Sequence, residues 1–211
     1  MKPYLTETEK GLALTDGNVS MMGDFSKEIP RIKKGVIGTE LIVKAAKIKG
    51  KDHPTAVDAT AGMGSDALLL AAAGFNVTMY EKDETIAALL EDALKRASED
   101  EYLSGITARM VLKKEDSINA LLNMKESPDV ILLDPMFPER EKSALIKKKF
   151  QLLQQLERPC SDEKELLDAA VSAKPKKIII KRPLKGPFLA GVKPSYSVNG
   201  KAIRVDVIVD P

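Results

Sequence analysis

The chain has 211 residues, of which 44% are hydrophobic and 30% charged. This length suits one compact α/β domain better than two. No apolar run approaches the ~20 residues of a membrane span, and the polar residues 1–10 lack a signal-peptide core. The single cysteine, Cys160, excludes an intrachain disulfide, and the single histidine, His53, excludes a His-rich metal site. We therefore expect a cytoplasmic protein without a metal and without membrane contact.

The formal net charge is only +2, but the charged residues are unevenly distributed along the chain. Basic residues gather at 31–34, 147–149, 174–177 and 181–182, and acidic residues at 81–84 and 99–101. Segregation of this kind can form a basic face for a polyanion. Solvated helix ends and loops explain any single cluster equally well.

The first 50 residues are predicted to form an extension with a short hairpin and a helix, and this extension can contact RNA. An apolar stretch at 12–14 precedes Thr15-Asp16-Gly17-Asn18, and the Asp-Gly pair favours a hairpin turn. Thr39 is expected to cap a helix over residues 40–48.

Residues 51–211 show the regular alternation of an α/β domain. Strands are predicted at 56–59, 76–80, 110–113, 130–133, 177–181 and 202–209, and helices at 66–73, 83–99, 117–123, 143–156 and 162–173. This alternation predicts a doubly wound parallel sheet with helices on both faces. A closing strand with no helix before it indicates an antiparallel hairpin at one edge. The combination is typical of the Rossmann-like, seven-stranded, mostly parallel sheet of class I S-adenosylmethionine-dependent methyltransferases.

A glycine-rich turn links the first strand of this domain to its first helix. Gly62 and Gly64 permit a tight turn and a close approach of backbone to a ligand. The helix that begins near Ser65 and Asp66 offers free N–H groups to a carboxylate, which S-adenosylmethionine carries. Asp58, at the end of the strand, is placed to pair with the ammonium group of the same cofactor.

Other residues are expected around the nucleoside part of a cofactor. Glu81 ends the second strand, where an acid commonly binds ribose hydroxyls. Asp116 and Ser117 follow the third strand and either meet an adenine amino group or cap the next helix. Ala67 stands where a dinucleotide fingerprint has its third glycine, so a nicotinamide enzyme stays open from this motif. No catalytic Tyr/Lys or His arrangement supports that alternative.

The segment Asp134-Pro135-Met136-Phe137-Pro138 directly follows an apolar strand. It is therefore expected at the carboxyl edge of the sheet, where ligands bind in open α/β folds. The prolines hold the backbone extended, so that carbonyls and the Asp134 carboxylate can accept hydrogen bonds from a planar amine. Phe137 can stack on a base. We take Asp134, Pro135 and Phe137 as the candidate catalytic residues.

Four stretches between residues 38 and 209 carry a family resemblance. They are VDATAGMGSDALLLAAAGFNV, YEKDETIAALLEDAL, VILLDPMFPEREKSALIKKKFQLLQ and IIIKRP. In these stretches the chain resembles the bacterial small-subunit ribosomal RNA guanine-N2 methyltransferases of the RsmJ (YhiQ) family. The resemblance implies cofactor contacts at Ser65, Asp66, Glu81, Lys82, Asp116, Ser117 and Asp134. It also implies a guanine in 16S ribosomal RNA as the target. The chain departs from the family at Ser65 and Lys82, where arginine is more usual.

Basic side chains near the catalytic segment are the candidate RNA contacts. They are Lys142, Lys147, Lys148 and Lys149 after the segment, and Lys181 and Arg182 at the end of a strand. With 4% aromatic residues and no tryptophan, recognition of RNA shape and one extruded base fits better than a broad stacking platform.

The leading hypothesis is methyl transfer from S-adenosylmethionine to a guanine amine of the small-subunit RNA or the 30S particle, with S-adenosylhomocysteine as product. A second hypothesis moves the same chemistry to adenine or to a glutamine side chain. A third is a non-catalytic RNA-binding assembly factor on the same fold.

Overall fold

The computed structural model describes residues 2–135, 152 and 163–211, and its centre is a seven-stranded sheet in the order β6-β5-β4-β7-β8-β10-β9. The strands are β4 (Thr55–Asp58), β5 (Asn76–Tyr80), β6 (Met110–Lys113), β7 (Val130–Leu133), β8 (Lys177–Pro183), β9 (Tyr196–Asn199) and β10 (Ile203–Val209). The first five strands in the sheet order are parallel, and β10 runs antiparallel between β8 and β9. The predicted mostly parallel, seven-stranded sheet is confirmed.

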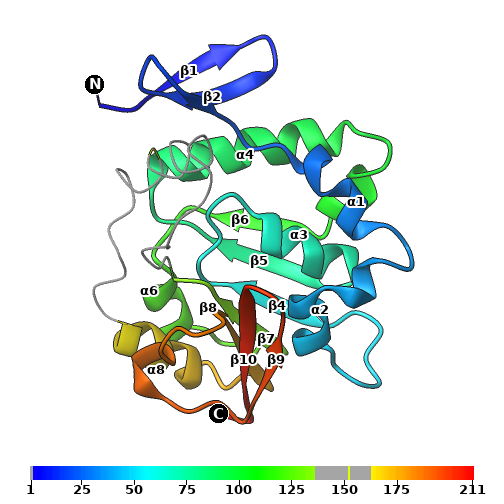
Figure 1. The fold of residues 1–211 in the computed structure, drawn as a ribbon, viewed down its shortest axis with the longest axis vertical. Helices are drawn as coiled ribbons and strands as arrows, with labels where there is room; N and C mark the ends of the chain where they lie inside the picture. The colour runs from blue at the N-terminus through cyan, green and yellow to red at the C-terminus, as the bar shows by residue number, and fades with distance from the viewer. Residues whose placement is uncertain (1, 136–151, 153–162) are drawn as a thin grey trace.

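Helices cover both faces of this sheet (Figure 1). One face packs against α2 (Leu41–Ala46), α3 (Ser65–Ala72) and α4 (Glu84–Ser98), and the other against α6 (Ser117–Leu122) and α8 (Glu163–Ser172). All four residues of β7 are buried because this central strand has apolar neighbours on each side. Because the five strands are parallel, their carboxyl ends lie along one edge of the sheet, and side chains that follow the strands are brought together there.

The N-terminal residues form a small antiparallel sheet of β1 (Tyr4–Thr8), β2 (Gly11–Thr15) and β3 (Ser20–Met21). It lies along α4, at the end of the molecule opposite β9 and β10 (Figure 1). The turn between β2 and β3 forms as predicted, because Asp16 accepts the amides of Asn18 and Val19 at 2.8 and 2.9 Å. Leu14, fully buried, packs with Leu89 of α4 and with Leu152.

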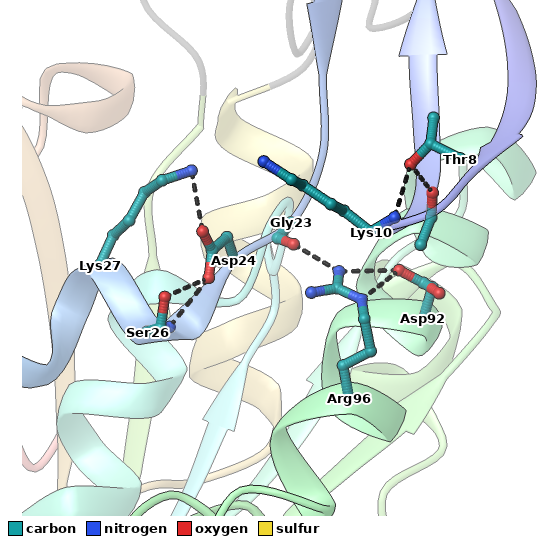
Figure 2. A network of polar contacts seen from close by, with 9 residues as sticks. Thr8, Lys10, Gly23, Asp24, Ser26, Lys27, Asp92 and Arg96 are labelled. Atoms are coloured by element: carbon teal, nitrogen blue, oxygen red, sulfur yellow. Dashed lines mark hydrogen bonds and ion pairs between the residues drawn. The ribbon is translucent and has the colours of Figure 1, made fainter.

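A polar network fixes the chain that leaves this small sheet (Figure 2). Arg96 of α4 pairs with Asp92 and donates to the carbonyl oxygen of Gly23 at 2.5 Å. Asp24 caps the short helix η1 (Phe25–Glu28) by accepting the amide of Ser26. Phe25 then enters the core beside the glycine-rich turn, so the N-terminal region and the sheet domain share one core.

The remaining short elements are α1 (Ile29–Ile32), η2 (Ile37–Thr39), α5 (Ser104–Thr107) and η3 (Leu189–Gly191). The helix predicted over residues 40–48 is shorter, and Glu40 rather than Thr39 is its N-cap because Thr39 ends η2. The helix predicted over 143–156 lies outside the described residues, apart from Leu152. In the described part of the chain, no helix has the length and apolarity needed to cross a bilayer.

Candidate active site

The glycine-rich turn between β4 and α3 has the geometry that its sequence predicts. Gly62 and Gly64 have φ values of +51° and +75°, a region that favours glycine. A Cβ at Gly64 would lie 2.7 Å from Cδ1 of Leu90, so this glycine is also required by packing. At Gly62 the nearest described atom is 4.0 Å from such a Cβ, which leaves the turn open. Gly64 is the N-cap of α3 and no side chain caps the helix, so its first amides can bind an anion.

Asp58 ends β4 beneath this turn and is 1% exposed. Its Oδ1 accepts the amide of Thr60 at 3.0 Å. Burial, and then repulsion from Asp66, raise the pKa of Asp58 to about 7. A buried carboxylate in this state gains most from a cationic ligand, because the ligand returns the stabilisation that burial removes.

Glu81 follows β5 on the other side of the turn and is largely buried. Its two carboxylate oxygens accept the amides of Gly62 and Asp83 at 3.0 and 2.9 Å. Burial raises the pKa of Glu81, and these backbone hydrogen bonds oppose part of that shift. A carboxylate has about four acceptor positions, so about two remain for the hydroxyls of a ribose.

Asp134 lies at the end of β7 and is held from two sides. Its amide donates to Oγ1 of Thr60 at 2.7 Å, which ties β7 to the chain after β4. Its carboxylate forms an ion pair with Lys181 of β8, and Lys181 also pairs with Asp66. Burial lowers the pKa of Lys181, but attraction to Asp66 and then Asp134 outweighs it, so the pKa lies above its ordinary value.

Asp116 and Lys82 lie beside each other near the ends of β6 and β5. Asp116 is the N-cap of α6 and accepts the amide of Ile118 at 2.9 Å. Its other carboxylate oxygen lies 3.3 Å from Nζ of Lys82. Ser117 is the first residue of α6. The capping role that the sequence left open for Asp116 is therefore present at the carboxyl edge.

The candidate RNA contacts are distributed differently from the cofactor residues. Arg182 has a side chain with 0% exposure, pairs with Glu163 and donates from Nε to the carbonyl of Pro187. The side chain does not reach the surface, so we propose no RNA contact for Arg182. Lys181 is turned into the acidic cluster of Asp66 and Asp134. The other candidate RNA contacts, Lys142, Lys147, Lys148 and Lys149, lie outside the described residues. Of the candidate catalytic residues, Phe137 also lies outside them, whereas Pro135 is described and buried.

Two features of the site were missed at the level of sequence: the hydroxyl of Thr60 as a support for Asp134, and Lys181 as the shared cation of Asp66 and Asp134. The position of Lys181 follows from strand register. Leu133 of β7 pairs with Ile180 of β8, so the next residues of these parallel strands, Asp134 and Lys181, meet at the carboxyl edge.

S-adenosylmethionine fits the residues present. The open turn at Gly62 gives a backbone surface, the uncapped start of α3 suits its carboxylate, and Asp58 suits its ammonium group. The remaining acceptor capacity of Glu81 suits its ribose. These features lie on the carboxyl edge of one sheet.

Fold and site together define the class of S-adenosylmethionine-dependent methyltransferases, and a family model described as "Putative SAM-dependent methyltransferase" matches residues 2–210. A relative from Chromobacterium violaceum, named ribosomal RNA small subunit methyltransferase J, is 46% identical over 80% of this chain and 67% of its own. Its namesake from Pseudomonas fluorescens Pf0-1 is 44% identical over 80% of this chain. The chain belongs to the family of ribosomal RNA small subunit methyltransferase J.

A solved structure agrees with this assignment. The crystal structure of a SAM-dependent methyltransferase from Neisseria gonorrhoeae aligns with a TM-score of 0.78 and 31% identity, covering 99% of this chain and 83% of that one. The chain spans 65% of the length of the Pseudomonas fluorescens relative, so it is shorter than that curated protein.

Proposed function

We propose that this protein transfers a methyl group from S-adenosylmethionine to the exocyclic N2 amine of a guanine in 16S ribosomal RNA, in the cytoplasm. S-adenosylhomocysteine is the product. The observation that carries the proposal is the placement of Asp134 at the carboxyl end of β7, next to the acidic cluster and the glycine-rich turn. The names of the relatives support small-subunit ribosomal RNA as substrate. The DPMFP motif supports an amine as acceptor.

The chain's own residues would hold the cofactor at both ends. Asp58 would bind the ammonium group. The first amides of α3, at Ser65 and Asp66, would bind the carboxylate. Glu81 would accept the ribose hydroxyls. The adenine end would be bound by Lys82, Asp116 and Ser117. The bound cofactor supplies an electrophilic methyl group.

The acceptor loop, residues 134–138, would orient the target amine. The nitrogen of a planar exocyclic amine is a poor nucleophile because its lone pair is delocalised into the ring. The Asp134 carboxylate and the carbonyl of Pro135 would accept its hydrogens and so aim the nitrogen toward the methyl group, which makes positioning and electrostatics the main catalytic effects. Phe137 would stack on the base. The surrounding RNA would be contacted by the N-terminal extension and by Lys142, Lys147, Lys148 and Lys149.

The test is labelled methyl transfer to 30S particles and to free 16S RNA from cells that lack this protein. We expect methylation of guanine by the unchanged protein and about a 100-fold or greater loss of kcat in Asp134→Ala, because the oriented acceptor is gone. The matched control is Asp168→Ala, which removes an exposed carboxylate of α8 that pairs with Lys164, and it should retain full activity.

The alternatives give different outcomes in the same assay. Label on adenine or on protein glutamine would replace the guanine assignment with one of the other amines. Binding of 30S particles without methyl transfer, and a cellular role unaffected by Asp134→Ala, would indicate a non-catalytic assembly factor.

A further inference from the structure

The loop that follows β8 presents an exposed aromatic ring beyond the carboxyl end of that strand. Lys181 of β8 contacts Asp134, and β8 continues through Pro183, roughly 7 Å further along the strand direction. The chain then turns, and Phe188 lies at the surface with 37% exposure, whereas its neighbour Leu189 is buried at 1%. The ring is thus carried by the chain that leaves β8 at the carboxyl edge of the sheet, the edge at which Asp134 also lies.

Arg204 of β10 fixes this loop from beneath. It is 6% exposed, and its Nη1 lies 2.9 Å from the carbonyl oxygens of Pro183, Leu184 and Gly186. The guanidinium carbon also lies 5.0 Å from the centre of the Phe188 ring. One buried cation therefore shapes the turn and supports the ring, in the distance range of a cation–π contact.

A second set of contacts fixes the far side of the same loop. Glu163, at the start of α8, accepts the amide of Ala190 at 3.0 Å and pairs with Arg182. Ala190 has a φ of +49°, which is uncommon for a residue with a Cβ. Several polar groups thus hold a strained loop that presents an exposed aromatic ring. Such preorganisation lowers the entropy lost when a ligand binds to the ring.

The segment that carries the ring has a charge that suits a polyanion. Residues 183–205 contain no aspartate or glutamate, and they include Lys185 and Lys201, both exposed. The amide of Leu184 donates to the carbonyl of Ala202 at 3.0 Å, so the neighbours of these two residues, Lys185 and Lys201, belong to adjoining turns. An exposed aromatic ring on a loop that also carries lysines suits the stacking of one base of a single strand and contacts to its phosphates.

We infer that Phe188 is a stacking platform for a nucleotide of the RNA that flanks the target guanine, with Lys185 and Lys201 as contacts to neighbouring phosphates. This inference rests on the proposed function. It assigns substrate recognition to the β8–β9 loop and the β9–β10 turn, in addition to the lysines that follow the acceptor loop.

The test compares Phe188→Ala, Phe188→Tyr and the unchanged protein in methylation of 30S particles from cells that lack this protein. We expect Phe188→Ala to raise the KM for particles about 5- to 30-fold, the equivalent of about 1–2 kcal/mol of lost stacking, while kcat and the Kd for S-adenosylmethionine stay within about twofold. Phe188→Tyr keeps a stacking ring and should restore KM. The control is Tyr102→Ala, an exposed aromatic beyond the far end of α4, which should leave KM unchanged.

The lysines are tested through salt dependence. Lys185→Ala and Lys201→Ala should each lower the slope of log affinity against log salt by about 1. Lys125→Ala, an exposed lysine in the connection that leads from α6 into the amino end of β7, should not change the slope. If the wild-type protein is active and Phe188→Ala has the same KM for particles, this inference alone would be overturned. An unchanged protein that neither binds nor methylates the particles would overturn the proposed function and this inference together.

Discussion

Replacing Asp58 by asparagine should stabilise the protein and weaken its cofactor site at the same time. Asp58 is buried, and its pKa is raised to about 7 from the ordinary value of 3.8 that it has in an unfolded chain. The folded state therefore prefers the protonated carboxyl. Ionisation of Asp58 leaves the free energy of unfolding unchanged below pH 3.8. It lowers that free energy increasingly as the pH rises from 3.8 to about 7, and by a constant amount above that.

The size of this destabilisation follows from the difference between the folded and unfolded pKa values of Asp58. At about pH 8 the ionised Asp58 destabilises the folded state by about 4 kcal/mol, and at about pH 5 by less than about 2 kcal/mol. The asparagine side chain would carry no charge and could still accept the amide of Thr60, but its NH2 group would need an acceptor in the buried site, which offsets part of the gain. We expect Asp58→Asn to be about 1–3 kcal/mol more stable at about pH 8, with the stability difference shifting against the variant by about 2–3 kcal/mol at about pH 5.

The assay is urea unfolding at both pH values, joined to calorimetric titration with S-adenosylmethionine. We expect the Kd to rise about tenfold or more, because a charge-assisted hydrogen bond to the ammonium group becomes a neutral one. Asp52→Asn, an exposed aspartate in the approach to β4, should change stability by less than about 0.5 kcal/mol. If Asp58→Asn were less stable at the higher pH, or if its stability difference did not vary with pH, the reasoning about a destabilised carboxylate would be refuted.

Two further variants test the geometry of the site. Lys181→Met removes the shared cation of Asp66 and Asp134. We expect the variant to lose about 2–3 kcal/mol of stability at about pH 8, and less at about pH 5 because Asp58 is protonated there. Equal losses at both pH values in urea unfolding would contradict this expectation. Gly64→Ala brings a Cβ within 2.7 Å of Leu90 at a φ of +75°, so its melting temperature should fall by several degrees, equivalent to about 2–3 kcal/mol. Gly35→Ala has a similar φ of +90° but no described atom within 4 Å of the new Cβ, and it should lose only about 1 kcal/mol. Equal melting temperatures for the two glycine variants would show that packing against Leu90 does not matter.

The parallel strands could be predicted because each directs apolar side chains into the core. The bounds expected for β5, β6 and β7 agree with the structure: β7 is a continuous apolar run, β5 alternates between buried and more exposed residues, and β6 is a short, mostly apolar segment. The strands β1 and β9 were not predicted as separate elements. Their side chains are mostly exposed or half-buried, so hydrogen bonding to β2 and β10 forms them without a hydrophobic pattern.

The acidic residues of the site could be predicted from strand ends, whereas their partners could not. Asp58 ends one apolar strand and Asp134 directly follows another, which places both at the carboxyl edge. Arg182 looked like a surface cation next to Lys181, and its burial depends on Glu163 and the carbonyl of Pro187, which come from distant or irregular parts of the chain. Side-chain direction at the end of a strand is decided by such tertiary partners.

Mass mapping of 16S ribosomal RNA tests the central claim most directly. RNA from cells with and without this protein would be digested and its guanine-containing fragments compared. The account predicts one fragment that lacks the mass of a single N2 methyl group when the protein is absent, regains it with the unchanged gene, and does not regain it with Asp134→Ala. Identical guanine methylation in all three samples would contradict the account.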